Sequence, residues 1–134
     1  MSGHRESVDH AEWTRVHQNA GRSARAAEQA CTAKEWATAG ALLVETAIGL
    51  TDALTINLAG VRCARDDHAL ALDLLNDVLP QTEGMQGNLE YLRSLIEDEA
   101  RVAKTGEPYT AMDVTRMAAQ LARYRTWVEG ILRP

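Results

Sequence analysis

Residues 36–61 constrain the fold most, because this stretch is long, apolar on most sides and poor in charge. Glu45 and Asp52 are its only charged residues, and with several threonines they argue against a membrane span. The stretch instead predicts a buried helix over residues 35–59, which Gly60 can end in a left-handed conformation. Such a helix is either the centre of a bundle or one side of a subunit interface.

The other segments also have helical patterns. Their apolar residues recur every three or four positions, and no period-two runs typical of strands are present. Asp9-x-x-Glu12 and Thr110-x-x-Asp113 fit capping boxes that open the first and last helices. We therefore predict an all-α, up-and-down bundle of four long helices plus one short helix. The expected helices cover residues 9–34, 35–59, a short segment ending at Pro80, 88–104 and 110 onward, in one domain over residues 1–134 with 1–8 as a flexible N-terminus.

Composition and charge narrow the class of protein. A chain of 134 residues with 46% hydrophobic and 25% charged residues fits one globular domain and is too apolar for intrinsic disorder. The net charge of −5 leaves no broad basic field, so nucleic acid would need a local site. Two cysteines and no signal-peptide pattern predict a cytoplasmic protein with reduced thiols and no membrane association.

Metal and cofactor motifs are scarce in the sequence. No histidine follows a glutamate at the Glu-x-x-His spacing of di-iron bundles, and glycine-rich phosphate loops are absent. We expect no metal and no cofactor. His10 and His17 lie two helical turns apart, which leaves a helical metalloprotein as one alternative. Cys63, close to two arginines, leaves a reactive thiol as another.

The linker after the apolar helix concentrates the polar groups that can act on a phosphodiester. It reads Arg62-Cys63-Ala64-Arg65-Asp66-Asp67-His68. Arginine binds phosphate in a planar fork, and histidine transfers protons near neutral pH. At a helix N-terminus these groups favour an anion. The structural alternative is that Asp66 or Asp67 caps the third helix and pairs with the arginines.

Two runs of the chain resemble a HEPN domain, from about residue 20 onward. They are AGALLVETAIGLTDALTINLAGVRCARDDHALALDLL and ARVAKTGEPYTAMDVTRMAAQLARYRTWVEGIL. HEPN proteins are helical bundles, usually dimeric, and many are metal-independent ribonucleases whose signature is an Arg, four to six residues and then a His. Arg62 and His68 are separated by five residues and follow the long apolar helix, as in that family.

The resemblance implies a metal-independent endoribonuclease of toxin or defence type, with its site at a homodimer interface. His68 would act as base on a ribose 2′-hydroxyl or protonate the leaving oxygen, and Arg62 would hold the scissile phosphate. We expect Arg65 and Asp67 to contact the RNA. A cognate antitoxin or a nucleotidyltransferase would be the partner, although Ala69-Leu70 replace the Tyr of members silenced by nucleotidyl modification. The alternative is a non-catalytic module that binds a nucleotide or a partner protein as a scaffold.

Overall fold

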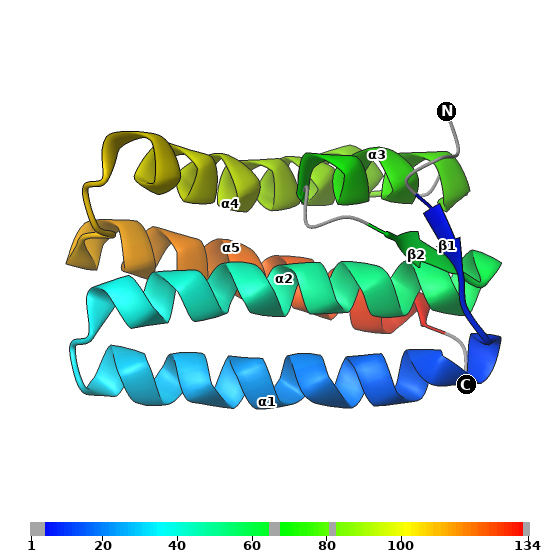
Figure 1. Ribbon diagram of the computed structural model, residues 1–134, viewed down its shortest axis with the longest axis horizontal. Helices are drawn as coiled ribbons and strands as arrows, with labels where there is room; N and C mark the ends of the chain where they lie inside the picture. The colour runs from blue at the N-terminus through cyan, green and yellow to red at the C-terminus, as the bar shows by residue number, and fades with distance from the viewer. Residues whose placement is uncertain (1–4, 65–67, 81–82, 133–134) are drawn as a thin grey trace.

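The computed structural model describes residues 5–64, 68–80 and 83–132. Over these residues the chain is an all-α bundle of four long helices and one short helix, as the sequence predicts. A short 3₁₀-helix and a two-stranded sheet are added at one end (Figure 1). In chain order the elements are β1 (Arg5–Ser7), η1 (His10–Glu12), α1 (Trp13–Thr32), α2 (Trp36–Ala59), β2 (Val61–Cys63), α3 (His68–Val78), α4 (Met85–Thr105) and α5 (Ala111–Ile131).

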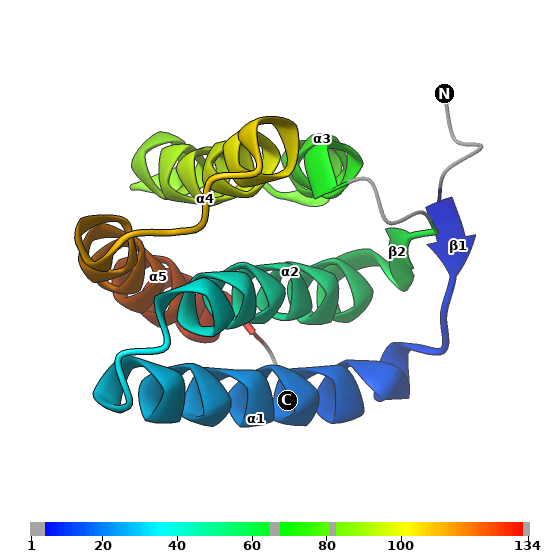
Figure 2. The same ribbon diagram turned by 60° about the vertical axis from the view of Figure 1, so that its left-hand side comes forward.

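Helix α2 is the centre of the bundle. It packs against α1, α3, α4 and α5, and Figure 2 shows it in the middle layer, with α1 below and α3 and α4 above. Among the described helices, α2 alone is long and apolar enough to span a membrane. However, 67% of its most apolar 18-residue stretch is buried inside the bundle. The protein's own core therefore accounts for the apolar character of this helix.

Small residues bring α1 close to α2. Ala20, Ala24 and Ala27 form the buried stripe of α1, which the helical spacing predicts. A Cβ atom added at Gly49 of α2 would lie only 3.0 Å from the Cβ atom of Ala20. This close approach holds the two antiparallel helices together, and the turn between them passes through Lys34 in a left-handed conformation, with φ of 59°.

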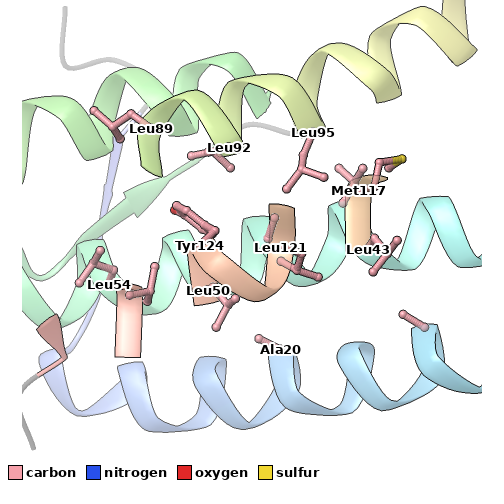
Figure 3. Packing of buried hydrophobic residues seen from close by; sticks show 14 of the residues in the cluster. Ala20, Leu43, Leu50, Leu54, Leu89, Leu92, Leu95, Met117, Leu121 and Tyr124 are labelled. Atoms are coloured by element: carbon pink, nitrogen blue, oxygen red, sulfur yellow. The ribbon is translucent and has the colours of Figure 1, made fainter. Parts of the chain in front are cut away.

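Helix α5 lies beside α2 in the middle layer and packs against α2 and α4 (Figure 2). Its buried residues are Val114, Met117, Leu121, Tyr124 and Val128, and Tyr124 is fully enclosed between α2 and α4 (Figure 3). The hydroxyl groups of Tyr124 and Thr51 lie 2.6 Å apart and share a hydrogen bond inside the core. This bond satisfies two polar groups whose burial would otherwise oppose folding.

The structure differs from the sequence prediction at the N-terminus. Residues 5–7, which we expected to be part of a flexible segment, form β1 and pair antiparallel with β2 in the predicted linker. Asp9 caps the short helix η1 by accepting a hydrogen bond from the Ala11 backbone, so α1 begins at Trp13. Three-residue strands leave no period-two pattern long enough to recognise in a sequence.

Helix α4 also differs from its prediction. It begins at Met85, ahead of the expected start at residue 88, and Gly84 precedes it in a left-handed conformation. Asp98 of this helix is buried at 8% exposure. Arg116 of α5 donates two hydrogen bonds to its carboxylate, at 2.8 and 2.9 Å, so the pair ties α4 to α5.

Candidate functional site

Gly60 and the small sheet position Arg62. The backbone leaves α2 at Gly60, which has φ of 64°, and the chain then enters β2. The backbone N–H of Val8 donates to the Gly60 carbonyl oxygen at 2.8 Å, and Glu6 lies directly opposite Arg62 in the antiparallel register. The N-terminal strand therefore fixes the backbone of the predicted phosphate-binding arginine.

Arg62 is paired with the acidic residue of that strand. Its Nε atom lies 3.5 Å from Oε1 of Glu6, and both side chains are partly exposed. The Nε atom itself is buried and forms no hydrogen bond with any residue in the described part of the chain. The guanidinium group is thus held to Glu6 by charge attraction, and a guanidinium group can bind an anion through two nitrogen atoms at once.

His68 forms a close pair with Glu99 of α4. Its Nδ1 atom lies 2.6 Å from Oε1 of Glu99, and the imidazole is half-buried. A carboxylate can only accept a hydrogen bond, so Nδ1 is the donor and the neutral ring has its lone pair at Nε2. A carboxylate behind a histidine in this way fixes the tautomer and stabilises the imidazolium that forms when Nε2 takes up a proton.

One small pocket unites the two predicted catalytic residues. Its volume is about 70 Å³. Such a pocket is far smaller than those that enclose whole organic ligands, so only a group the size of a small anion fits inside it. Residues from α2, β2 and α3 line it: Ile48, Asp52, Arg62, Cys63, Ala64, His68 and Ala71.

Asp52 is the acid in this pocket. Burial raises the pKa of Asp52 from 3.8 to about 6, although the charges of Arg62 and His68 act in the opposite direction. Glu6 adds to the rise. Near neutral pH a fraction of this carboxyl group therefore keeps its proton, whereas an ordinary aspartate is fully ionised.

The linker holds further residues that the sequence singles out, namely Cys63, Arg65, Asp66 and Asp67. Arg65 and Asp67, the expected substrate contacts, lie outside the described residues, as does Asp66, the other candidate helix cap. The side chain of Cys63 is buried and packs with Ala71 and Leu74. That packing favours a structural role for Cys63 over the reactive thiol that remained as an alternative.

The two histidines considered for a metal site have separate partners. The Nε2 atom of His10 lies 3.0 Å from the backbone oxygen of Asn57, and the Nε2 atom of His17 lies 2.8 Å from Oε2 of Glu129. In the described part of the chain, no three metal-ligating side chains gather into a group. His10 therefore connects η1 to α2, and His17 connects α1 to α5.

Sequence reasoning missed Glu6, Asp52 and Glu99 as members of the site. Glu99 lies 31 residues from His68 along the chain, and no local spacing connects the two. Asp52 did leave a signal, because an acid within an apolar, central helix needs a compensating partner or a function. By sequence alone, this acid indicates only that the stretch does not span a membrane.

Comparison with protein-family models, with curated proteins and with solved structures finds no match for this chain. The resemblance to the HEPN family therefore stays a prediction based on the motif and its place in the bundle. The structure defines the class as an all-α helical bundle, with a small polar pocket at the end where α2 meets the sheet.

Proposed function

We propose that the chain is a metal-independent endoribonuclease of toxin or defence type, active as a cytoplasmic homodimer. The observation that supports it most is the 2.6 Å contact between His68 Nδ1 and Glu99, next to Arg62 in one pocket. Proton transfer by an oriented histidine beside a guanidinium group suits cleavage of a phosphodiester. Neither group requires a metal ion for this chemistry.

In the proposed reaction Nε2 of His68 removes the proton from a ribose 2′-hydroxyl. The 2′-oxygen attacks the adjacent phosphorus, and Arg62 binds the non-bridging oxygens as their negative charge grows. A bond forms between the 2′-oxygen and phosphorus, and the bond to the 5′-oxygen breaks. The departing 5′-oxygen takes up a proton, so the products are a 2′,3′-cyclic phosphate and a 5′-hydroxyl end.

Acidic side chains around the pocket oppose the binding of a phosphate group. Glu6, Asp52 and Glu99 place three carboxyl groups around Arg62 and His68. These acids repel a phosphate, so the scissile group must compete with Glu6 for Arg62. We therefore expect moderate affinity for the phosphate alone, with the rest of the RNA bound outside the pocket.

The test is cleavage of a mixed RNA pool in EDTA by the wild type and by three variants, Arg62→Gln, His68→Ala and Glu99→Gln. The proposal predicts cyclic phosphate ends from the wild type and a loss of about 10²-fold or more in the His68 and Arg62 variants. Glu97→Gln is the matched control for Glu99→Gln, because Glu97 is an exposed acid on the same helix.

Two results would refute the proposal. The first is cleavage that disappears in EDTA, because it would indicate a metal-dependent reaction. The second is RNA cleavage at the same rate by the wild type and by the His68→Ala protein. That outcome would favour the alternative, a module that binds a nucleotide or partner without cleaving it. Expression in cells provides an independent check, since the proposal predicts growth inhibition that His68→Ala relieves.

A further inference from the structure

Asp52 lies at the site without a role in the reaction described so far. It belongs to α2, where Thr51 and Ala53 on either side are buried, and its own side chain is half-buried. Its carboxyl group lines the same pocket as Arg62 and His68. Burial and the charges of Arg62, His68 and Glu6 act on this carboxyl group, without a hydrogen bond from a described residue, whereas most buried polar side chains have at least one.

The charged and titratable groups around Asp52 come from every neighbouring element. Arg62 of β2 and His68 of α3 favour its ionised form, and Glu6 of β1 opposes it. Tyr124 of α5 also lies within electrostatic range, and its own burial keeps its hydroxyl protonated. Desolvation is the largest of these effects, so the pKa of Asp52 rises to about 6. An acid in this range can both hold and donate a proton near neutral pH.

Cleavage of a phosphodiester needs two proton transfers, and within one copy of the pocket His68 supplies only one of them. When His68 takes the proton of the 2′-hydroxyl, the departing 5′-oxygen still needs a proton of its own. Glu99 is occupied by the imidazole, and Glu6 is occupied by Arg62. Among the described acids at the pocket, Asp52 is the one without such a partner.

We propose that Asp52 is the general acid of this site and protonates the leaving 5′-oxygen of an RNA chain. The inference rests on the proposed ribonuclease function. In one turnover the proton of the 2′-hydroxyl goes to His68, and the proton of Asp52 goes to the 5′-oxygen as its bond to phosphorus breaks. Hydrolysis or release of the cyclic phosphate follows, and exchange with water restores both protonation states. The overall proton balance is therefore zero.

The sharpest test changes the leaving group. The wild type is first used to map a cleaved linkage in an RNA oligomer, and a second oligomer then has a bridging 5′-sulfur at that linkage. A thiolate departs without a proton, so it removes the need for a general acid. We expect Asp52→Asn to cleave the all-oxygen RNA at least about 10²-fold more slowly than the wild type. It should cleave the sulfur substrate within about threefold of the wild type.

Two controls separate this role from a structural one. His68→Ala should be slow on both oligomers, because the base is needed whichever group leaves. Asp73→Asn, a change of an exposed acid on α3, should behave as the wild type on both. Equal slowing of Asp52→Asn on both oligomers would overturn the inference in favour of a structural role, and wild-type rates on both would also overturn it.

Failure of the inference is distinguishable from failure of the proposed function. If the wild type cleaves RNA with cyclic phosphate ends but sulfur does not rescue Asp52→Asn, only the inference about Asp52 fails. If the wild type leaves both oligomers intact, the ribonuclease proposal fails, and the inference fails with it.

Discussion

The position of Asp52 has a measurable consequence for folding. Its pKa in the folded state is about 6, above the ordinary value of 3.8, so the folded chain holds this proton more tightly than the unfolded chain. The contribution of Asp52 to the free energy of unfolding therefore decreases as the pH rises from about 4 to about 6. The loss amounts to at most about 3 kcal/mol, because a half-buried carboxyl group keeps part of its hydration.

We predict that Asp52→Asn stabilises the protein above that range. The amide resembles the protonated carboxyl group, so the variant avoids the cost of a buried charge. Urea denaturation at about pH 8 should give a free energy of unfolding higher than that of the wild type by up to about 3 kcal/mol. At about pH 4 the two proteins should be nearly equal. A variant less stable than the wild type at the higher pH would contradict this account.

Glu99 should determine which nitrogen of His68 holds the proton. In the wild type the carboxylate accepts from Nδ1 at 2.6 Å, so we predict that the neutral ring is protonated at Nδ1. Nitrogen-15 chemical shifts of the neutral imidazole report this directly. Glu99→Ala removes the acceptor and should shift the population toward the Nε2-protonated form, whereas Glu97→Ala should not. A wild-type ring protonated mainly at Nε2 would exclude Nε2 as the base.

The residues of the site differ in how far a sequence can reveal them. Arg62 and His68 lie within one short linker, so their spacing was visible, and the structure places them in one pocket. Glu99 and Glu6 reach the site through the packing of α4 and the pairing of β1, which are long-range contacts without a local pattern.

At the scale of elements, close contacts fix how the helices pack. A Cβ atom at Gly40 of α2 would lie 2.3 Å from the ring of Tyr109, a distance that no packed atoms tolerate. We predict that Gly40→Ala lowers the free energy of unfolding by about 1–3 kcal/mol, because Tyr109 must move. Gly87 is an exposed helical glycine, and a Cβ atom added to it would have no other atom within 4 Å. Gly87→Ala should therefore raise the free energy of unfolding by about 0.4–1 kcal/mol.

Chemical denaturation of both glycine variants measures this pair of opposite effects. At Gly87 the substitution measures only the intrinsic preference of alanine for a helix. At Gly40 the same preference is opposed by the steric conflict with Tyr109. Stabilisation of the protein by both substitutions would show that the segment around Tyr109 adapts freely. The packing of α2 against that segment would then contribute little to the fold.

The short strand β1 places the acidic side chain of Glu6 next to Arg62. Glu6 lies 3.5 Å from Arg62, so it occupies the position of an anionic ligand. We predict that Glu6→Gln strengthens the binding of inorganic phosphate by up to about fivefold, the range expected for removal of one exposed ion pair. Shifts of the Arg62 resonances during a phosphate titration measure the affinity. Glu107→Gln, in an exposed loop, is the matched control.

Equal phosphate affinity in the wild type and in Glu6→Gln would mean that Glu6 does not compete for the guanidinium group. Absence of any shift at Arg62 in both proteins would contradict its role as a phosphate ligand altogether.

The elements themselves were predictable to different degrees. Thr110 and Asp113 form the capping box that the sequence indicates, with backbone hydrogen bonds of 2.9 and 3.1 Å, so the start of α5 was clear. Gly60 ends α2 in the left-handed conformation, as predicted. The sheet was not foreseen, because each strand has only three residues and depends on the other for its backbone hydrogen bonds.

At the scale of the whole molecule, the structure changes which surface can form a dimer. The sequence left open whether α2 is the centre of a bundle or an interface, and its burial by four other helices removes it as a main interface. Helix α5 borders two open grooves. One groove, of about 660 Å³, lies beside α1, and another, of about 520 Å³, lies beside α4. Ala122 and Thr126 line both grooves.

We therefore predict that the proposed homodimer, if it uses α5, is broken by Ala122→Arg. Ala122 is exposed, and arginine is a good helix former, so the monomer should keep its stability. A long charged side chain at the centre of an interface would prevent close contact between two copies. Sedimentation of the wild type at micromolar concentration should give the mass of a dimer, and the variant should give the mass of a monomer.

Ala103→Arg is the matched control, because Ala103 is an exposed alanine near the end of α4, away from both grooves. It should leave the dimer intact. Dissociation by both substitutions would indicate a general effect of added charge and not a local interface. A wild-type protein that sediments as a monomer would exclude a site shared between subunits. Cleavage of RNA by that monomer would then have to depend on one copy of Arg62 and His68.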